Sequence, residues 1–260
     1  MRNVEAEGIR SVAGAPAMKL MITRCDEFDS MAAQQIARLV AAKPGAVLGT
    51  ATGSTTVGVH RELVRLHHGS QLDFARVTVF HVDEYVGPGS THPVSCRAQM
   101  EQQLLCHVDI DRRNVFFPYG STASLESQCR TFEDEIATRG GIDCQVLGIG
   151  ANGHVGLNEP GTPLESTTHV ADLSPKTIAT MARCFASGAD VPAKGITMGI
   201  KTIMLARRVM LLAKGDDKAD IVHEALFGSV TTDVPASVLQ LHPDLLVVLD
   251  EKAAARIAAR

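Results

Sequence analysis

The sequence has 260 residues, of which 45% are apolar and 21% charged, and its formal net charge is −4. This composition is typical of a globular protein, and the length favours one large domain or one domain with a small appended unit. The weak negative charge and the absence of a basic tract argue against a nucleic-acid surface. No apolar run approaches the roughly 20 residues that span a bilayer, so we expect no membrane contact.

The six cysteines are scattered along the chain and form no CxxC pair. In a chain of this length, that pattern is typical of packed, reduced thiols in a cytoplasmic protein, and it disfavours a disulfide scaffold or a zinc site. The segment MRNVEAEGIRSVAGAP lacks the apolar core of a signal peptide. We therefore expect a flexible leader over residues 1–16 and a single domain over residues 17–260, with no metal.

Short apolar segments alternate with amphipathic ones from residue 18 onward. The apolar segments predict strands at 18–22, 46–51, 77–82, 144–150, 208–214 and 244–250. The amphipathic segments predict helices at 29–42, 57–66, 94–106, 123–138, 174–183, 200–206 and 218–227. Asp29 or Ser30 is the expected N-cap of the first helix, and Gly228 follows the last.

Strands of nearly continuous apolar composition, separated by helices, predict an α/β fold. We expect a single Rossmann-like domain, with a mostly parallel sheet covered by helices on both faces. In such sheets ligands bind where the carboxyl ends of the strands lead into loops and helix N-termini. The polar residues that follow each strand are therefore the candidate functional residues.

The first such loop, Thr52 to Thr56, follows the strand 46–51 and opens a helix. Backbone amides and hydroxyls at a helix N-terminus form an anion site, although the glycine spacing and lysine of a Walker A loop are missing. The alternative interpretation is an ordinary Ser/Thr N-cap.

Asp83 and Glu84 follow the strand 77–82. Adjacent side chains leave an extended backbone in opposite directions, so we expect one carboxylate to face the site and the other to face away. A partly desolvated carboxylate at a strand end can serve as a general base with a raised pKa. The alternative is a pair of solvated loop acids.

The segment GIGANGHVGLNEP (148–160) follows the strand 144–150 and is rich in glycine. Its glycines allow the backbone to approach a ligand closely. His154 is the side chain here that is suited to proton transfer near neutral pH, and Glu159 could orient it. A structural histidine is the alternative.

Two cations could complete an anion site. Lys218 follows the strand 208–214 in GDDKAD, and Arg183 ends the predicted helix 174–183. Either side chain could bind a phosphate group, or either could be a solvated surface charge.

Taken together, these segments resemble the glucosamine-6-phosphate deaminase/isomerase family over residues 18–250. The motifs that carry the resemblance are ATGSTT (51–56), VDEY (82–85), HP (92–93), GIGANGHVGLNEP (148–160), VPAKGITMGI (191–200) and VPASVLQLHP (234–243). Several long motifs in the same order make the resemblance specific.

The resemblance implies a reaction in which glucosamine 6-phosphate is ring-opened and enolised, giving fructose 6-phosphate and ammonia. Asp83 would be the enolisation base, and His154 would open the ring with support from Asn152 and Glu159. The phosphate would bind to Gly53, Ser54 and Thr55, with Arg183 and Lys218. The resemblance implies no cofactor and no metal, and it allows a monomer or a homo-oligomer.

Some departures from the family pattern bear on substrate and mechanism. Asn152 stands where some members have aspartate, so its amide could orient His154 but could not share a proton. Cys96 replaces a usual tyrosine and is similar to the galactosamine-6-phosphate deaminase branch, which would give tagatose 6-phosphate. His169 and Ala171 replace cations of an allosteric site, so we expect no strong allosteric activation.

Two further hypotheses remain on the same scaffold. One is a hydrolase similar to 6-phosphogluconolactonase, which needs no enolisation base. The other is a non-catalytic sugar-phosphate sensor, although such sensors usually carry a DNA-binding module for which this chain has no basic segment.

Overall fold

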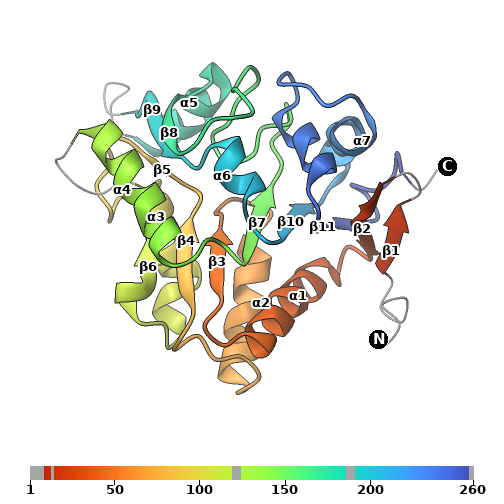
Figure 1. Cartoon of the computed structure of the whole chain (residues 1–260), viewed down its shortest axis with the longest axis horizontal. Helices are drawn as coiled ribbons and strands as arrows, with labels where there is room; N and C mark the ends of the chain where they lie inside the picture. Colours follow the sequence, from red (N-terminus) through yellow and green to blue (C-terminus); the bar gives the residue numbers. More distant parts are fainter. Residues whose placement is uncertain (1–8, 13–14, 119–123, 186–190, 258–260) are drawn as a thin grey trace.

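The computed structural model describes residues 9–12, 15–118, 124–185 and 191–257, which form two sheets and their covering helices (Figure 1). The larger sheet has eight strands in the order β1 (Ile9–Val12), β2 (Ala15–Thr23), β11 (Leu245–Asp250), β10 (Val209–Ala213), β7 (Cys144–Gly148), β3 (Val47–Thr50), β4 (Thr78–His81) and β6 (Val115–Phe116). The smaller sheet has three strands in the order β5 (Asp83–Tyr85), β9 (Lys194–Thr197) and β8 (His169–Asp172).

All neighbouring strands of the large sheet from β2 to β6 are parallel. The helices are α1 (Phe28–Ala42), α2 (Val57–His68), α3 (Cys96–Gln103), α4 (Leu125–Thr138), α5 (Pro175–Met181), α6 (Ile200–Met204) and α7 (Ala219–Phe227). Short 3₁₀ turns lie at Leu105–His107, Arg112–Asn114, Ala182–Cys184, Asp216–Lys218 and Pro235–Leu241. Within the described ranges, no helix is long and apolar enough to cross a membrane.

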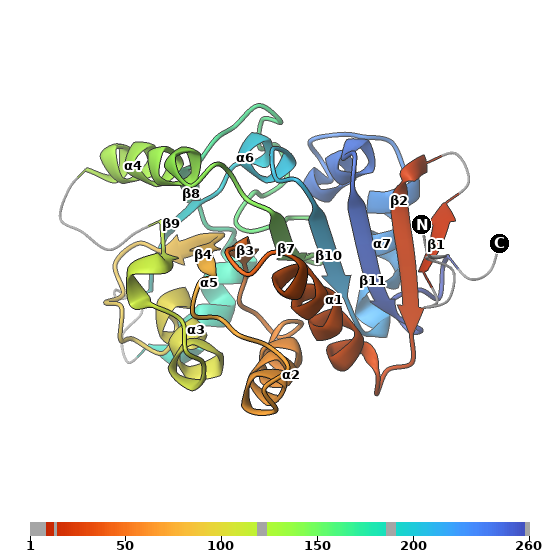
Figure 2. The same ribbon diagram turned by 60° about the horizontal axis from the view of Figure 1, so that its bottom comes forward.

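The helices cover both faces of the large sheet, as the alternating pattern predicts (Figure 2). Alternate residues of one strand enter different cores: Leu211 of β10 packs in the core under α6 and α7, and Leu212 packs in the core under α1 and α2. This two-sided burial explains why the parallel strands read as continuous apolar runs. The predicted α/β class, with a mostly parallel sheet and two covered faces, is confirmed.

The N-terminal segment differs from the expectation of a flexible leader. Ile9–Val12 form strand β1, which pairs antiparallel with β2 at the edge of the sheet, and β2 itself begins at Ala15. The sequence gives little indication of β1, because this strand has only four residues and is stabilised by pairing with β2 and not by a long apolar run.

The predicted N-cap of α1 is wrong. The helix begins at Phe28 after Glu27, and no side chain caps it. Asp29 accepts a hydrogen bond from Lys214 Nζ at 2.9 Å, and Ser30 Oγ donates to the Glu27 carbonyl at 2.9 Å. The Asp29 carboxylate therefore pairs with Lys214, which is distant in the sequence, and does not cap α1 as the local sequence predicts.

Candidate active site

The candidate site lies where the strand order of the large sheet reverses. From β3 the chain proceeds through β4 to β6 on one side, whereas β7, β10 and β11 extend to the other side. The crevice between the carboxyl ends of β3 and β7 is the usual ligand position in open α/β sheets. The loops after β3, β4, β7 and β10, which carry the candidate residues predicted from the sequence, all leave this edge.

Asp83 occupies the junction of the two sheets. β4 ends at His81, and after Val82 the chain enters β5 at Asp83, which pairs with Thr197 of β9. The Val82 amide donates to the Thr50 carbonyl at 2.8 Å, and the Val82 carbonyl accepts from the Met198 amide at 2.7 Å. The backbone before Asp83 is thus held by both sheets, which fixes the direction of its side chain.

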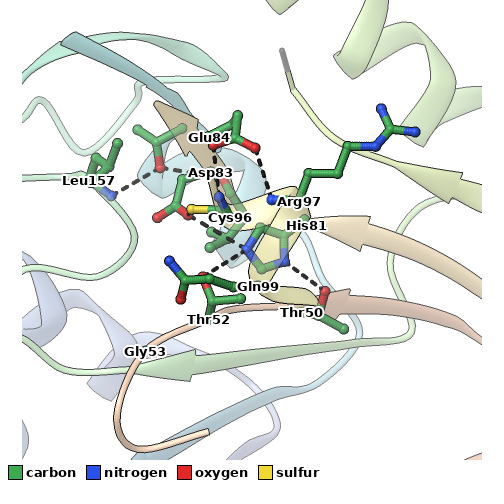
Figure 3. A network of polar contacts seen from close by, with 12 residues as sticks. Thr50, Thr52, Gly53, His81, Asp83, Glu84, Cys96, Arg97, Gln99 and Leu157 are labelled. Carbon is green, nitrogen blue, oxygen red and sulfur yellow. Dashed lines mark hydrogen bonds and ion pairs between the residues drawn. The ribbon is translucent and has the colours of Figure 1, made fainter. Parts of the chain in front are cut away.

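The carboxylates of Asp83 and Glu84 point in different directions, as strand alternation predicts (Figure 3). Glu84 is buried and accepts hydrogen bonds from Ser95 Oγ and from the amides of Cys96 and Arg97, at 2.8–2.9 Å. A carboxylate at the first amides of α3 is favoured by the helix dipole. Glu84 therefore anchors α3, and Asp83 remains for the site.

The environment of Asp83 favours its neutral form more than water does. Its carboxyl Oδ1 accepts from Cys96 Sγ at 3.3 Å and lies 3.7 Å from His81 Nε2. Desolvation raises the pKa of Asp83 to about 7, which the Cys96 hydrogen bond partly opposes. A carboxylate with a pKa in this range is suited to proton abstraction near neutral pH.

His81 is a neutral neighbour of Asp83. It is fully buried, and burial lowers its pKa to about 3. Its Nδ1 lies 3.0 Å from Thr50 Oγ1 and its Nε2 lies 3.4 Å from Thr52 Oγ1. The contact with Thr52 connects the loop after β3 to the Asp83 side of the site (Figure 3).

Asn152 bridges Glu159 and His154. Its Nδ2 donates to Glu159 Oε2 at 2.7 Å, and its Oδ1 lies 2.7 Å from His154 Nδ1. An ionised carboxylate can only accept, so Glu159 fixes the orientation of the amide. The amide oxygen then requires the proton of His154 to be on Nδ1, which leaves the lone pair on Nε2. Glu159 itself is 3.8 Å from the ring.

Two glycines of this loop are required by its packing. A Cβ on Gly150 would lie 2.1 Å from the His154 ring, so the imidazole packs directly on the backbone there. Gly153 has a φ of +83°, and a Cβ on it would lie 2.7 Å from Val234 Cγ1. Ala236 also donates its amide to the Gly153 carbonyl at 2.8 Å. The segment around Val234 therefore packs against the loop that carries His154 and stabilises it.

The loop after β3, predicted as an anion site, leads into α2. Gly53 has a φ of +131°, and Gly53 and Ser54 are exposed while Thr55 is half-buried. The alternative of an ordinary side-chain N-cap is not realised: Thr56 precedes α2 without capping it and donates instead to the Gly53 carbonyl at 3.1 Å. The first amides of α2 thus have no side-chain acceptor from the cap position.

The two predicted cations differ in position. Lys218 ends the turn after β10, at the same sheet edge, and its largely buried side chain lies 3.8 Å from Asp217. Arg183 is exposed on the 3₁₀ turn after α5. Within the described ranges, neither side chain hydrogen-bonds to the loop at Gly53, Ser54 and Thr55.

A cavity of about 560 Å³ opens beside the His154 loop. Tyr85, Asn152, His154, Ser174, Thr177 and Met181 are among its lining residues. It joins the loop after β7 to β5 and to the helix α5 that precedes Arg183. Its volume is in the usual range for a small-molecule site.

Sequence reasoning missed several residues around Asp83. His81 lies within the predicted strand 77–82, and a histidine inside the apolar run VTVFHV is a signal of a buried polar group. Cys96 stands out in the sequence only as a departure from the family pattern, because its contact with Asp83 depends on α3 folding back onto β5. Thr197 donates to the Val82 carbonyl at 3.4 Å, so the segment 191–200 contributes by pairing with β5.

Comparison with known proteins identifies the family of this chain. The model of the family described as glucosamine-6-phosphate isomerases/6-phosphogluconolactonase matches residues 23–247. A glucosamine-6-phosphate deaminase of Clostridium perfringens is 43% identical over 91% of this chain and 98% of its own length. One from Thermoanaerobacter pseudethanolicus is 43% identical over 92% of this chain and 95% of its own length.

Solved structures extend the comparison to the fold. A monomeric glucosamine-6-phosphate deaminase superposes with a TM-score of 0.87 at 41% identity, covering 91% of this chain and 99% of the other. A 6-phosphogluconolactonase of Trypanosoma brucei gives a TM-score of 0.72 at 20% identity, over 92% of this chain and 98% of the other, which is a likeness of fold alone. With a family model that spans most of the chain and relatives above 40% identity, the chain belongs to the glucosamine-6-phosphate isomerase/6-phosphogluconolactonase family.

Proposed function

We propose that this protein is a glucosamine-6-phosphate deaminase, converting glucosamine 6-phosphate and water to fructose 6-phosphate and ammonia. The observation that carries the proposal is Asp83, a shielded carboxyl with a pKa of about 7 at the switch point of the sheet. Enolisation requires such a base, whereas lactone hydrolysis does not. The relatives at 43% identity bear the deaminase name, which supports the same choice within the family.

In the proposed reaction His154 opens the sugar ring. The chain Glu159–Asn152–His154 holds the imidazole with its proton on Nδ1, so Nε2 can accept the proton of the anomeric hydroxyl as the ring bond breaks. That proton is returned to the ring oxygen. The result is the open-chain aldehyde, with its amine still on C2.

Asp83 then moves one proton. Its carboxylate removes the proton from C2, and the electron pair moves onto the aldehyde oxygen O1, which takes up a proton to give the enolamine. Asp83 then returns its proton to C1 and the nitrogen gives up one proton, so that an imine is left at C2 and the proton gained by O1 is balanced by the one lost from nitrogen. Water adds to this imine, and ammonia leaves as the ketone forms. The substrate's own carbonyl accepts the negative charge that develops at C2.

The phosphate group is assigned to the loop at Gly53, Ser54 and Thr55. The exposed loop and the uncapped first turn of α2 support this assignment, because amides at a helix N-terminus bind anions. Lys218 lies at the same sheet edge and would add a cation. Arg183 is exposed on the turn after α5 and would reach the phosphate from there.

The test is ammonia release from glucosamine 6-phosphate and, separately, from its C4 epimer galactosamine 6-phosphate. We expect turnover of the first, and faster turnover of the epimer would assign the second substrate. Asp83→Asn should lower kcat by about 10²–10⁴-fold, the usual loss for a general base. Hydrolysis of 6-phosphogluconolactone that survives Asp83→Asn, without ammonia release from either sugar, would overturn the proposal in favour of a lactonase.

A further inference from the structure

His81, Asp83 and Cys96 bring three metal-ligating atoms together. A ring nitrogen of His81, a carboxylate oxygen of Asp83 and the sulfur of Cys96 all lie within 4.8 Å of one another. Oδ1 of Asp83 is 3.3 Å from the sulfur and 3.7 Å from Nε2 of His81 (Figure 3). Among the residues that the structure describes, this is the one group of three such ligands.

The two separations from the Asp83 oxygen match those of ligands around one ion, and the His81 nitrogen and the Cys96 sulfur lie within 4.8 Å of each other. With metal–nitrogen and metal–oxygen distances of about 2.0–2.2 Å and a metal–sulfur distance of about 2.3 Å, tetrahedral ligands stand roughly 3.3–3.7 Å apart. One imidazole, one thiolate and one carboxylate form a donor set suited to Zn²⁺. Three protein ligands leave a fourth position for water.

Neighbouring groups hold the three ligands in place. Thr50 Oγ1 lies 3.0 Å from His81 Nδ1, and a partner on that nitrogen directs Nε2 towards the cluster. Glu84 accepts from the Cys96 amide at 2.9 Å and so fixes the start of α3. The three ligands come from β4, β5 and α3, so the fold assembles the cluster without a local metal motif.

We propose that His81, Asp83 and Cys96 form an inhibitory binding site for a thiophilic divalent cation of the Zn²⁺ class. Binding releases the thiol proton of Cys96, and the resulting thiolate and the Asp83 carboxylate offset the two positive charges of the ion. The inhibition rests on the proposed function, because a metal-bound Asp83 cannot accept the C2 proton. The binding itself does not depend on that function.

Cobalt binding tests the site without reference to activity. Chelator-treated protein titrated with Co²⁺ is expected to develop a sulfur-to-cobalt charge-transfer band at one equivalent, and Zn²⁺ should abolish it. Cys96→Ser should remove the band, whereas Cys25→Ser and Cys106→Ser, which change exposed thiols, should retain it. Absence of the band in the unmodified protein would overturn the proposal, as would a band that persists in Cys96→Ser.

A second variant keeps all three ligands. Thr50→Val removes the group opposite the metal-binding face of His81 and should weaken Zn²⁺ affinity by about 10–100-fold, measured by competition with a chelating dye. An unchanged affinity would count against the site.

Ammonia release then tests inhibition. Zn²⁺ at one equivalent should abolish it in the unmodified protein and in Cys106→Ser, and a chelator should restore it. Cobalt binding at Cys96 with undiminished ammonia release would leave the binding site established and would overturn its inhibitory role. If metal-free protein, from which the chelator has also been removed, releases no ammonia, that result counts against the proposed function alone.

Discussion

At the scale of single residues, Asp83 is controlled by the groups that touch its carboxyl. Desolvation raises its pKa to about 7, and the hydrogen bond from Cys96 opposes this rise. A base must be ionised to accept a proton, so activity should increase as the pH rises through about 7. The thiol of Cys96, whose own pKa is raised by burial, stays protonated in this range and keeps its role as donor.

Removal of that thiol should move the acid limb of the pH profile. In Cys96→Ala the carboxylate loses a hydrogen bond that stabilises its charged form, so the pKa of Asp83 should rise and the acid limb of kcat/KM should shift to higher pH. Cys129→Ala, a buried cysteine on α4, is the matched control and should leave the limb in place. A limb that moved to lower pH in Cys96→Ala would contradict this account.

Asn152 controls His154 by fixing a tautomer. Asn152→Asp would place a second carboxylate against the imidazole, which favours the imidazolium over the neutral ring needed to accept a proton. We expect kcat to fall at neutral pH and to recover as the pH is raised, measured from pH 6 to 9. Asn114→Asp, near the start of β6, is the control. An unchanged pH profile of kcat in Asn152→Asp would contradict the proposal that the amide of Asn152 sets the protonation of His154.

At the scale of elements, the loop after β7 depends on a segment more than 80 residues away. Gly153 packs against Val234, which precedes the turn Pro235–Leu241, and its carbonyl accepts a hydrogen bond from the amide of Ala236, which lies on that turn. This contact explains why VPASVLQLHP, which has no side chain among the candidate catalytic residues, accompanies the loop in the family resemblance. The turn acts as a support for the residues that hold His154.

Gly153→Ala should disturb that support. The substitution places a Cβ on a residue with a φ of +83° and 2.7 Å from Val234, so the loop must move or the core must shift. We expect the free energy of unfolding to fall by about 1–3 kcal/mol, measured by denaturant titration. Gly89→Ala, where a Cβ meets no atom within 4 Å, should change it by less than about 0.5 kcal/mol. Equal effects of the two would contradict the packing argument.

The strands show which parts of the fold can be predicted from the sequence. The six predicted strands are all present, because strands buried on both faces leave continuous apolar runs. The sequence does not predict the strands β1, β5, β6, β8 and β9, since each has two to four residues and takes its conformation from pairing with another strand. The candidate residues after β3, β4 and β7 could be placed at one edge from topology alone. The cluster of His81 and Cys96 around Asp83 could not, because it depends on how α3 packs.

At the scale of the whole molecule, the site and the N-terminal strand lie at different parts of the large sheet. The candidate site is at the ends of β7, β3 and β4, whereas β1 pairs only with β2 at the far edge in the described ranges (Figure 1). The proposed catalytic residues thus follow inner strands of the sheet, and β1 forms one of its edges. Stability and catalysis should therefore be separable there.

Deletion of residues 1–12 should separate the two. Loss of β1 exposes the backbone donors and acceptors of β2, so we expect a lower melting temperature with kcat unchanged at temperatures where the protein is folded. Calorimetry and ammonia release on the same preparation provide the measurement. A loss of kcat in the folded protein would show that the edge of the sheet communicates with the site.

The position of Asp83 between the sheets has a consequence for how motion could be observed. Val82 is hydrogen-bonded to Thr50 of the large sheet and to Met198 beside the small one. The bond to Met198 continues the pairing of β5 with β9, so it moves with the small sheet, whereas the bond to Thr50 joins Val82 to the large sheet. A separation of the two sheets must therefore break the bond between the Val82 amide and the Thr50 carbonyl, and it would move the carboxyl of Asp83 at the same time. Deuterium uptake at the Val82 amide therefore reports, at one backbone position, how often the proposed base is displaced.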